Sequence, residues 1–187
     1  CGALQFNLTL QPGESRTINV FLGTAADEEE VSGAIARSRE AGFVESSFQA
    51  LKENWSSYLG AWESRLPDKD AERMINIWNP YQAHRNFLFS RNISFYATGT
   101  FRGVGYRDTA QDILAVVPFD TELAFDKLKL LLGQQYKDGH VNHYFFPNEG
   151  WDPVTSIHSD DHLWTALAAW DLLAETGDAA FLKTKVP

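Results

Sequence analysis

Cysteine is nearly absent from the sequence, because Cys1 is the only one among 187 residues. No disulfide can therefore form within the chain, and a chain without internal disulfides suits the reducing cytoplasm. The sequence also lacks an apolar run of the roughly 18 residues that a membrane span requires, and no secretory leader is visible. We therefore expect a cytoplasmic protein without a membrane partner.

Positive charge is scarce as well. The chain carries 16 Lys and Arg against 25 Asp and Glu, a formal net charge of −9. Proteins that bind nucleic acids meet the phosphate backbone with clustered Lys and Arg, so this balance argues against a nucleic-acid partner. Aromatic residues are plentiful instead, with six Trp, six Tyr and thirteen Phe. A core can absorb such rings, but carbohydrate sites also use them as flat apolar walls.

The first 25 residues predict a β-hairpin. Apolar and polar residues alternate in "LQFNLTL" (4–10) and "SRTINVFLG" (15–23), on both sides of the turn sequence "QPGE" (11–14). A lone hairpin is marginally stable in water, so we expect it to be the end of a larger β domain. The chain opens in a strand pattern without Met and stops at Pro187 within a helical pattern. We therefore expect a piece of a longer polypeptide.

From residue 27 onward the pattern is helical, without the alternation of strands and helices that a doubly wound sheet requires. The second expected helix buries an aromatic stripe and ends at Pro67, and the third breaks at Asn79-Pro80. Sequential helices of this kind favour a barrel of helical hairpins. The expected helices cover 27–42, 48–66, 70–78, 81–92, 108–119, 120–135 and 160–177, and a loop rich in Gly, Pro, His and Trp covers 138–159.

The stretch "FRGVGYRDTAQD" (101–112) concentrates charge around two glycines. It lacks the third glycine of a dinucleotide fingerprint and the Gly-Lys-Ser/Thr ending of a phosphate loop, so a nucleotide site is a weak hypothesis. Asp108 with Gln111 three residues later has the spacing of a capping box, which would give this carboxylate a structural role. Ser159 or Asp160 could cap the last helix in the same way.

Capping leaves Arg102, Arg107, Asp112 and one member of the Asp160–Asp161 pair without a role. Salt bridges among these residues are the simplest explanation. A sugar site would account for them together, because a carboxylate accepts from two neighbouring hydroxyls while an arginine fork donates to them. Glycines let the backbone approach the ring closely. The apolar face of the sugar could then be covered by Trp151, Tyr106 or Phe101.

Histidines gather near the last helix and invite a metal hypothesis. Zinc takes three or four nitrogen, sulfur or carboxylate ligands, but no HExxH motif is present and a loop of this length fixes no ligand geometry. We therefore expect no metal. The residues concerned are His140, His143, His158, Asp160, Asp161 and His162.

Five segments in order resemble the catalytic domain of glycoside hydrolase family 94, which includes cellobiose, chitobiose, cellodextrin and 1,2-β-oligoglucan phosphorylases. The resemblance implies a mainly α fold. It divides the chain into the end of an N-terminal β-sandwich (1–25), a helical linker (26–69) and the first part of an (α/α)6 catalytic barrel (70–187). The segments are "NIWNPYQ" (76–82), "SRNISFYATG" (90–99), "RGVGYRDTAQD" (102–112), "QQYKDGHVNHYFFP" (134–147) and "HSDDHLW" (158–164).

The resemblance also assigns roles to residues. Arg102 and Asp108 match the arginine and aspartate of the family motif R-G-x-G-[FY]-R-D, which hold the donor sugar. Arg107 and the Asp160–Asp161 pair belong to the same site by analogy, and Trp151 remains a candidate apolar wall. The chain is thereby expected to bind the sugar from which a glycosyl unit is transferred.

The implied reaction is inverting phosphorolysis of a β-linked glucosyl or N-acetylglucosaminyl disaccharide or oligosaccharide to a sugar 1-phosphate. Inorganic phosphate is the co-substrate, no cofactor is required, and the full-length enzyme could be a homodimer. The family's general acid lies in a D-W-N-D motif that is absent from these 187 residues, so Asp160 is the fallback acid and the chain alone is expected to be inactive. An inverting hydrolase with a second carboxylate as base, or a non-catalytic carbohydrate-binding fragment, remain alternatives.

Overall fold

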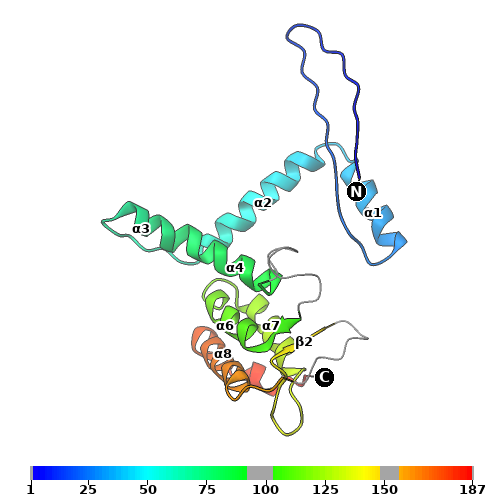
Figure 1. The fold of residues 1–187 in the computed structure, drawn as a ribbon. Helices are drawn as coiled ribbons and strands as arrows, with labels where there is room; N and C mark the ends of the chain where they lie inside the picture. The colour runs from blue at the N-terminus through cyan, green and yellow to red at the C-terminus, as the bar shows by residue number, and fades with distance from the viewer. Residues whose placement is uncertain (1, 92–102, 148–155, 187) are drawn as a thin grey trace. The chain divides into compact units, whose positions relative to one another are not determined.

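The computed structural model describes residues 2–91, 103–147 and 156–186 (Figure 1). The predicted site residues Arg102 and Trp151 lie outside the described residues. Contacts divide the chain into two units, residues 1–52 and 53–187. None of the helices in the described ranges is long and apolar enough to cross a membrane.

The N-terminal segment contains the predicted turn but not the predicted strands. Glu14 N donates to Gln11 O at 2.9 Å, and Gly13 has a φ of +82°, as the third residue of a Pro-Gly turn requires. Residues 2–26 contain no strand, so the predicted pairing of two strands on either side of the turn is wrong. Within the described part of the first unit, few contacts hold this segment, and most of its apolar side chains remain exposed. These are Leu4, Phe6, Leu8, Leu10, Ile18, Val20 and Leu22.

Two helices follow the N-terminal segment. α1 (Glu28–Ser38) begins after Asp27, the first residue of the predicted helix 27–42, and the Asp27 carboxylate accepts from Glu30 N at 2.9 Å. It ends before Gly42, which adopts the left-handed region with a φ of +80°. α2 (Phe43–Gly60) begins directly after this glycine. The single helix predicted over 27–42 therefore stops a few residues early.

The aromatic stripe of α2 is buried only near its C-terminal end. Tyr58 is buried, and the rings of Trp55 and Tyr58 pack against His84 with centroid distances of 5.2 and 4.7 Å. Phe48 and Leu51 are 62% and 50% exposed, because no described element covers this part of α2. The helix also ends at Gly60, before the predicted stop at Pro67.

The predicted break at Asn79-Pro80 is wrong. α3 (Lys69–Arg73), the π-helical segment η1 (Met74–Trp78) and α4 (Asn79–Phe89) follow one another without interruption. Asn79 N donates to Met74 O, which is the wider hydrogen-bond spacing of a π turn. Pro80 occupies the first turn of α4, where a missing N–H is tolerated. The wider turn lets the helix pass the proline.

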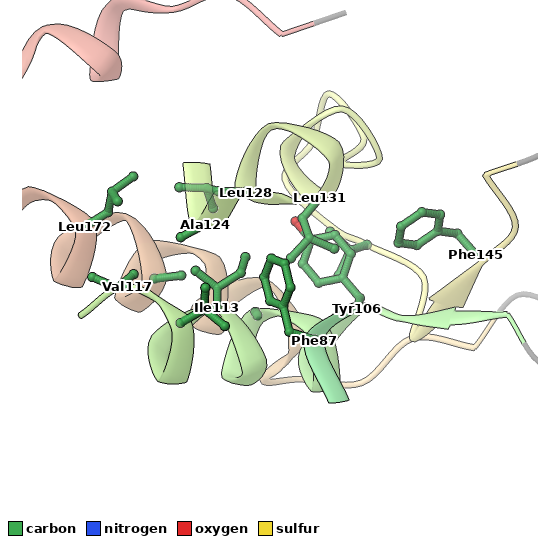
Figure 2. Packing of buried hydrophobic residues seen from close by; sticks show 13 residues of the cluster. Phe87, Tyr106, Ile113, Val117, Ala124, Leu128, Leu131, Phe145 and Leu172 are labelled. Carbon is green, nitrogen blue, oxygen red and sulfur yellow. The ribbon is translucent and has the colours of Figure 1, made fainter. Parts of the chain in front are cut away.

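α6 (Tyr106–Val116) is the central helix of the second unit and packs against α4, α7 (Thr121–Leu132) and α8 (Asp161–Thr176). Its buried residues recur at three- and four-residue steps, so one face of the helix enters the core. Figure 2 shows these side chains between the surrounding helices. The core consists of Phe87, Tyr106, Ala110, Ile113, Val116, Val117, Ala124, Leu128, Leu131, Val141, Phe145, Ala168 and Leu172.

The start of α7 and the end of α8 agree with the sequence analysis, whereas α7 ends at Leu132, before the predicted 135. Asp120 caps α7 by accepting from Leu123 N at 2.9 Å. Gly177 ends α8 in the left-handed region with a φ of +65°, and the short 3-10 segment η2 (Ala180–Lys183) follows. The apolar residues Leu163, Leu167 and Trp170 are exposed, whereas the face of α8 that packs on the core carries Asp161, Thr165, Ala168 and Leu172.

A short antiparallel ribbon joins the glycine-rich motif to the segment before α8. β1 (Val104–Gly105) pairs with β2 (Tyr144–Phe145), so part of the region predicted as loop is a strand. Two-residue strands are too short to produce an alternating pattern. A Cβ on Gly103 would lie 2.8 Å from Phe145 O, so this close approach requires glycine.

We predict that Gly103→Ala destabilises the second unit by about 1–3 kcal/mol, because the added methyl group must displace backbone. Thermal or urea unfolding measures the change. Gly60→Ala is the matched control, since an added Cβ there meets nothing within 4 Å. Equal midpoints for Gly103→Ala and the unsubstituted protein would contradict the described ribbon.

Candidate functional site

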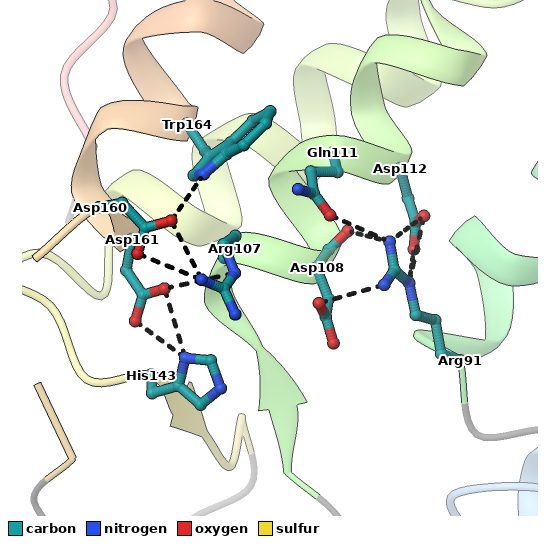
Figure 3. Close-up of polar contacts among 9 residues, drawn as sticks. All are labelled: Arg91, Arg107, Asp108, Gln111, Asp112, His143, Asp160, Asp161 and Trp164. Atoms are coloured by element: carbon teal, nitrogen blue, oxygen red, sulfur yellow. Dashed lines mark hydrogen bonds and ion pairs between the residues drawn. The ribbon is translucent and has the colours of Figure 1, made fainter. Parts of the chain in front are cut away.

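Charged side chains meet where α6 and α8 begin. α6 contributes Arg107 and Asp108 from its first turn, and Asp160 and Asp161 stand at the start of α8. Figure 3 shows that the two helix starts face each other through these residues, with His143 below them. The structure thus brings together four of the six residues predicted for the site. The other two are the undescribed Arg102 and Trp151.

Asp108 does not cap α6, so the capping-box interpretation is wrong. The helix begins two residues earlier, at Tyr106, because Tyr106 N donates to His143 O at 2.8 Å and thereby continues the β1–β2 ribbon. Gly105 is the cap residue and offers no side chain. The Asp108 carboxylate instead forms an ion pair with Arg91, with 3.1 Å between Oδ1 and Nη1, and its side chain is 28% exposed.

Asp160 is bound by two donors from different helices. Arg107 Nη1 lies 3.0 and 3.2 Å from its two carboxylate oxygens, and Trp164 Nε1 donates to Oδ2 at 3.3 Å. The hydrogen bond from Arg107, supported by that from Trp164, holds the pKa of Asp160 below its usual range. Asp160 occupies the cap position of α8, but its carboxylate faces Arg107 and makes no capping hydrogen bond.

Asp161 has a different environment from its neighbour, since its side chain is fully buried. Because a carboxylate only accepts, His143 donates to it from Nδ1 at 3.0 Å from Oδ2. Arg107 Nε lies 3.9 Å from Oδ1 and adds a weaker attraction. His158 stacks on the His143 ring with 4.0 Å between centroids.

These contacts define which residues could hold a metal. Among the described residues, one ligand atom each from His143, His158 and Asp161 come within 4.8 Å of one another. The remaining members of the predicted histidine cluster are not part of this group; His140 instead pairs with Asp138. The guanidinium of Arg107 is close to the same carboxylate, and a fixed positive charge there opposes a cation.

Arg91 is a site residue that the sequence analysis did not identify. It follows the end of α4, and both Ser90 and Arg91 adopt the left-handed region, with φ of 47° and 60°. Non-glycine residues in this region cost of order 1–3 kcal/mol unless their surroundings hold them. Its partners lie 17 to 21 residues further along the chain, a separation that no local pattern reveals.

The guanidinium of Arg91 contacts α6 at several points. Its Nε and Nη2 lie 3.1 and 2.9 Å from the two oxygens of Asp112, and Nη2 also donates to Asp108 O at 3.2 Å. Burial raises the pKa of the Asp112 carboxyl, and the hydrogen bonds from Arg91 oppose this rise. The same hydrogen bonds raise the pKa of Arg91, so the guanidinium stays charged beside Asp112.

Arg107 offers the N–H donors of its guanidinium, and Asp108 and Asp160 offer carboxylates, all in partly exposed positions. Arg107 and Asp160 have side chains 32% and 44% exposed, so a ligand can reach both. Carboxylate oxygens accept from hydroxyl groups, and guanidinium N–H groups donate to them. This donor and acceptor set suits a neutral ligand that is rich in hydroxyl groups.

Comparison with known proteins agrees with this chemistry. N,N'-diacetylchitobiose phosphorylase of Vibrio furnissii is 32% identical over all of the chain and 26% of its own length. Cyclic beta-(1,2)-glucan synthase NdvB of Rhizobium meliloti is 33% identical over all of the chain and 6% of its own length. Solabiose phosphorylase of Paenibacillus borealis is 32% identical, with 22% of its length covered. The chain thus spans about a quarter or less of these relatives.

Two family models divide the chain between them. Residues 1–41 match the supersandwich domain of glycosyl hydrolase 94, and residues 54–187 match the catalytic domain of the glycosyl hydrolase 94 superfamily. The described part of the catalytic match is mainly helical, with one two-stranded sheet, which agrees with part of a helical barrel. The chain therefore belongs to the glycosyl hydrolase 94 superfamily.

Proposed function

We propose that this chain supplies the donor-sugar part of the active site of an inverting glycoside phosphorylase. The enzyme would transfer a β-linked glucosyl or N-acetylglucosaminyl unit to inorganic phosphate. The observation that carries the proposal is the group of partly exposed charged residues Arg107, Asp108 and Asp160 at the helix starts of a catalytic-domain segment of this superfamily. Several relatives are phosphorylases by name, which supports phosphorolysis as the reaction.

The roles follow from hydrogen-bond chemistry. Asp108 and Asp160 would accept from sugar hydroxyls, while Arg107 would donate to a hydroxyl oxygen and keep Asp160 ionised. Arg102 is proposed as a second donor on the strength of the sequence motif, and Trp151 as an apolar wall. A bound sugar would be oriented for attack at its anomeric carbon without any of these groups moving a proton.

The proposed reaction exchanges one bond at the anomeric carbon for another. A phosphate oxygen forms a bond to this carbon from one face, while the bond to the leaving oxygen breaks on the opposite face and that oxygen receives a proton from a carboxylic acid. Phosphate is already an anion, so it needs no carboxylate base of the kind an inverting hydrolase uses to activate water. The anomeric configuration is inverted, and the products are a sugar 1-phosphate and a shortened sugar.

Asp160 is a poor candidate for the proton donor. A general acid must carry a proton at the working pH, and the hydrogen bonds from Arg107 and Trp164 lower the pKa of Asp160. We therefore assign Asp160 to sugar binding. These 187 residues contain no D-W-N-D motif, so we propose that the acid belongs to another part of the catalytic domain. The lowered pKa thus argues against Asp160 as the fallback general acid.

Phosphorolysis and hydrolysis differ in a product that can be measured directly. A polypeptide that carries this chain within a complete catalytic domain should release sugar 1-phosphate from a β-linked disaccharide only when phosphate is added. Release of free donor sugar at the same rate without phosphate would favour the hydrolase. No turnover of either kind would favour a non-catalytic role.

The first prediction for the site concerns Asp108. In the complete catalytic domain, Asp108→Asn should lower kcat/KM for the donor substrate roughly 10- to 150-fold, because a hydrogen bond to a charged group contributes about 1.5–3 kcal/mol. Asp126→Asn is the matched control, because this exposed aspartate of α7 pairs with Lys129 away from the site. A variant that melts earlier but keeps full phosphorolysis would assign Asp108 to structure alone.

A second prediction concerns the ionisation of Asp160. Its folded-state pKa is depressed, so the pairing with Arg107 should be present above the ordinary carboxyl pKa of about 3.9 and be lost as the pH falls through the lower folded value. Carboxyl titration by NMR measures this, and Arg107→Gln should move the pKa of Asp160 upward. An Asp160 that titrates above the ordinary value would restore it as a candidate acid.

A third prediction is that activity does not depend on a bound metal. Arg107 stands beside the carboxylate of the His143, His158 and Asp161 group, and the proposed reaction uses phosphate alone as co-substrate. Dialysis against EDTA should leave the rate of phosphorolysis unchanged, and elemental analysis should detect no stoichiometric zinc. Activity that is lost to EDTA and restored by zinc would reverse this assignment.

A further inference from the structure

Arg91 links three parts of α6 to the end of α4. Its guanidinium reaches the Asp108 carboxylate through Nη1, the Asp108 carbonyl through Nη2, and the Asp112 carboxylate through Nε and Nη2 (Figure 3). We propose that Arg91 is a positioning residue, which fixes the carboxylate of Asp108 for binding the donor sugar. This inference rests on the sugar-binding role of Asp108 proposed above.

The contact of Arg91 with Asp112 anchors the guanidinium, and its contact with Asp108 is the positioning contact. Asp112 has a side chain only 10% exposed, and its two oxygens accept from Nε and Nη2, so this side of the guanidinium is held within the protein. A guanidinium is planar and rigid, and fixing two of its nitrogens therefore fixes the third. Nη1 is the third nitrogen, and it lies 3.1 Å from Asp108 Oδ1.

The backbone before α6 supports the same conclusion. Ser90 and Arg91 both have positive φ, so the chain turns sharply at the end of α4. This turn directs Arg91 to the first turns of α6, where Asp108 and Asp112 lie four residues apart on one helix face. Such strained positions persist where surrounding contacts hold them, and the contacts that the structure shows are those to α6.

A residue that acts through Asp108 has a signature that a purely structural residue lacks. Removing Arg91 would leave Asp108 in place but with a less defined orientation, and loss of orientation of a binding group lowers catalytic efficiency. In a variant whose residue 108 is no longer a charged acceptor, removing Arg91 should change the catalytic efficiency little. The two substitutions are therefore expected to be non-additive.

The experiment is a double-mutant cycle of Arg91→Gln and Asp108→Asn in the complete catalytic domain, with phosphate-dependent release of sugar 1-phosphate as the assay. We expect Arg91→Gln to lower kcat/KM for the disaccharide roughly 10- to 100-fold in the unsubstituted background, and by less than about twofold in the Asp108→Asn background. Arg73→Gln is the matched control, because this exposed arginine pairs with Asp70 on α3 and should change neither value.

Stability is measured in parallel, because Arg91 also anchors α4 to α6. Asp112→Asn removes the charge of the anchor but keeps Arg91, so it should lower the melting temperature with a smaller effect on kcat/KM than Arg91→Gln. Should Arg91→Gln fail to fold, Arg91→Lys takes its place in the cycle. A single ammonium group keeps the positive charge but cannot contact both carboxylates as the fork does, so the same loss and the same non-additivity are expected.

The outcomes are distinguishable. Full activity of Arg91→Gln, or losses that multiply in the double variant, would overturn the positioning role while leaving the proposed function intact. Full activity of Asp108→Asn would overturn the proposed sugar-binding role, and the inference on Arg91 with it. A loss for Arg91→Gln that disappears in the Asp108→Asn background supports both.

Discussion

The close approach of Gly103 to Phe145 is the constraint on which the arrangement of the site depends. It allows β1 to pair with β2, and this pairing places the Tyr106 N–H on His143 O, where α6 begins. The side chain of the same His143 then reaches Asp161 at the start of α8. One backbone contact thus sets the start of α6 and the position of the histidine that faces α8.

The Asp160–Asp161 pair shows how two adjacent carboxylates acquire different surroundings. Asp161 faces the protein, where an unpaired charge would be costly, and His143 supplies its hydrogen bond. Asp160 is partly exposed, and the hydrogen bond from Arg107 lowers its pKa, so its carboxylate is accessible to a ligand. The buried carboxylate maintains the architecture, and the exposed one is available for recognition.

Features that depend on neighbouring residues could be predicted from the sequence, whereas those that depend on distant contacts could not. Asp27, Asp120 and Gly177 were predicted as helix ends, and each acts through residues within one turn. Asp108 has the same local signature, but the contact from Tyr106 to His143 moves the start of α6 and overrides it. Arg91 lies in the family-like segment 90–99, but no local pattern linked it to Asp108 or Asp112, because these partners lie on another helix.

The candidate site was recognised from motifs, because five weak patterns in order are specific where one alone is not. Arg107, Asp108, Asp160 and Asp161 were predicted from the sequence as residues of the site. Their division into an exposed pair, a buried carboxylate and an arginine-bound carboxylate required the packing of α4, α6 and α8. Residue type identifies the chemistry that a site can perform, and packing decides which residue performs it.

The sequence separation of the contacts at the site has a consequence for folding. Val104 pairs with Phe145, and Arg107 meets Asp160 across 53 residues, so neither contact can form early during synthesis from the N-terminus. Contacts of high sequence separation form slowly, because a long loop must close before they are made. α6 can therefore emerge from the ribosome as a helix with an undefined start, and its charged first turn acquires its final partners only once α8 has been synthesised.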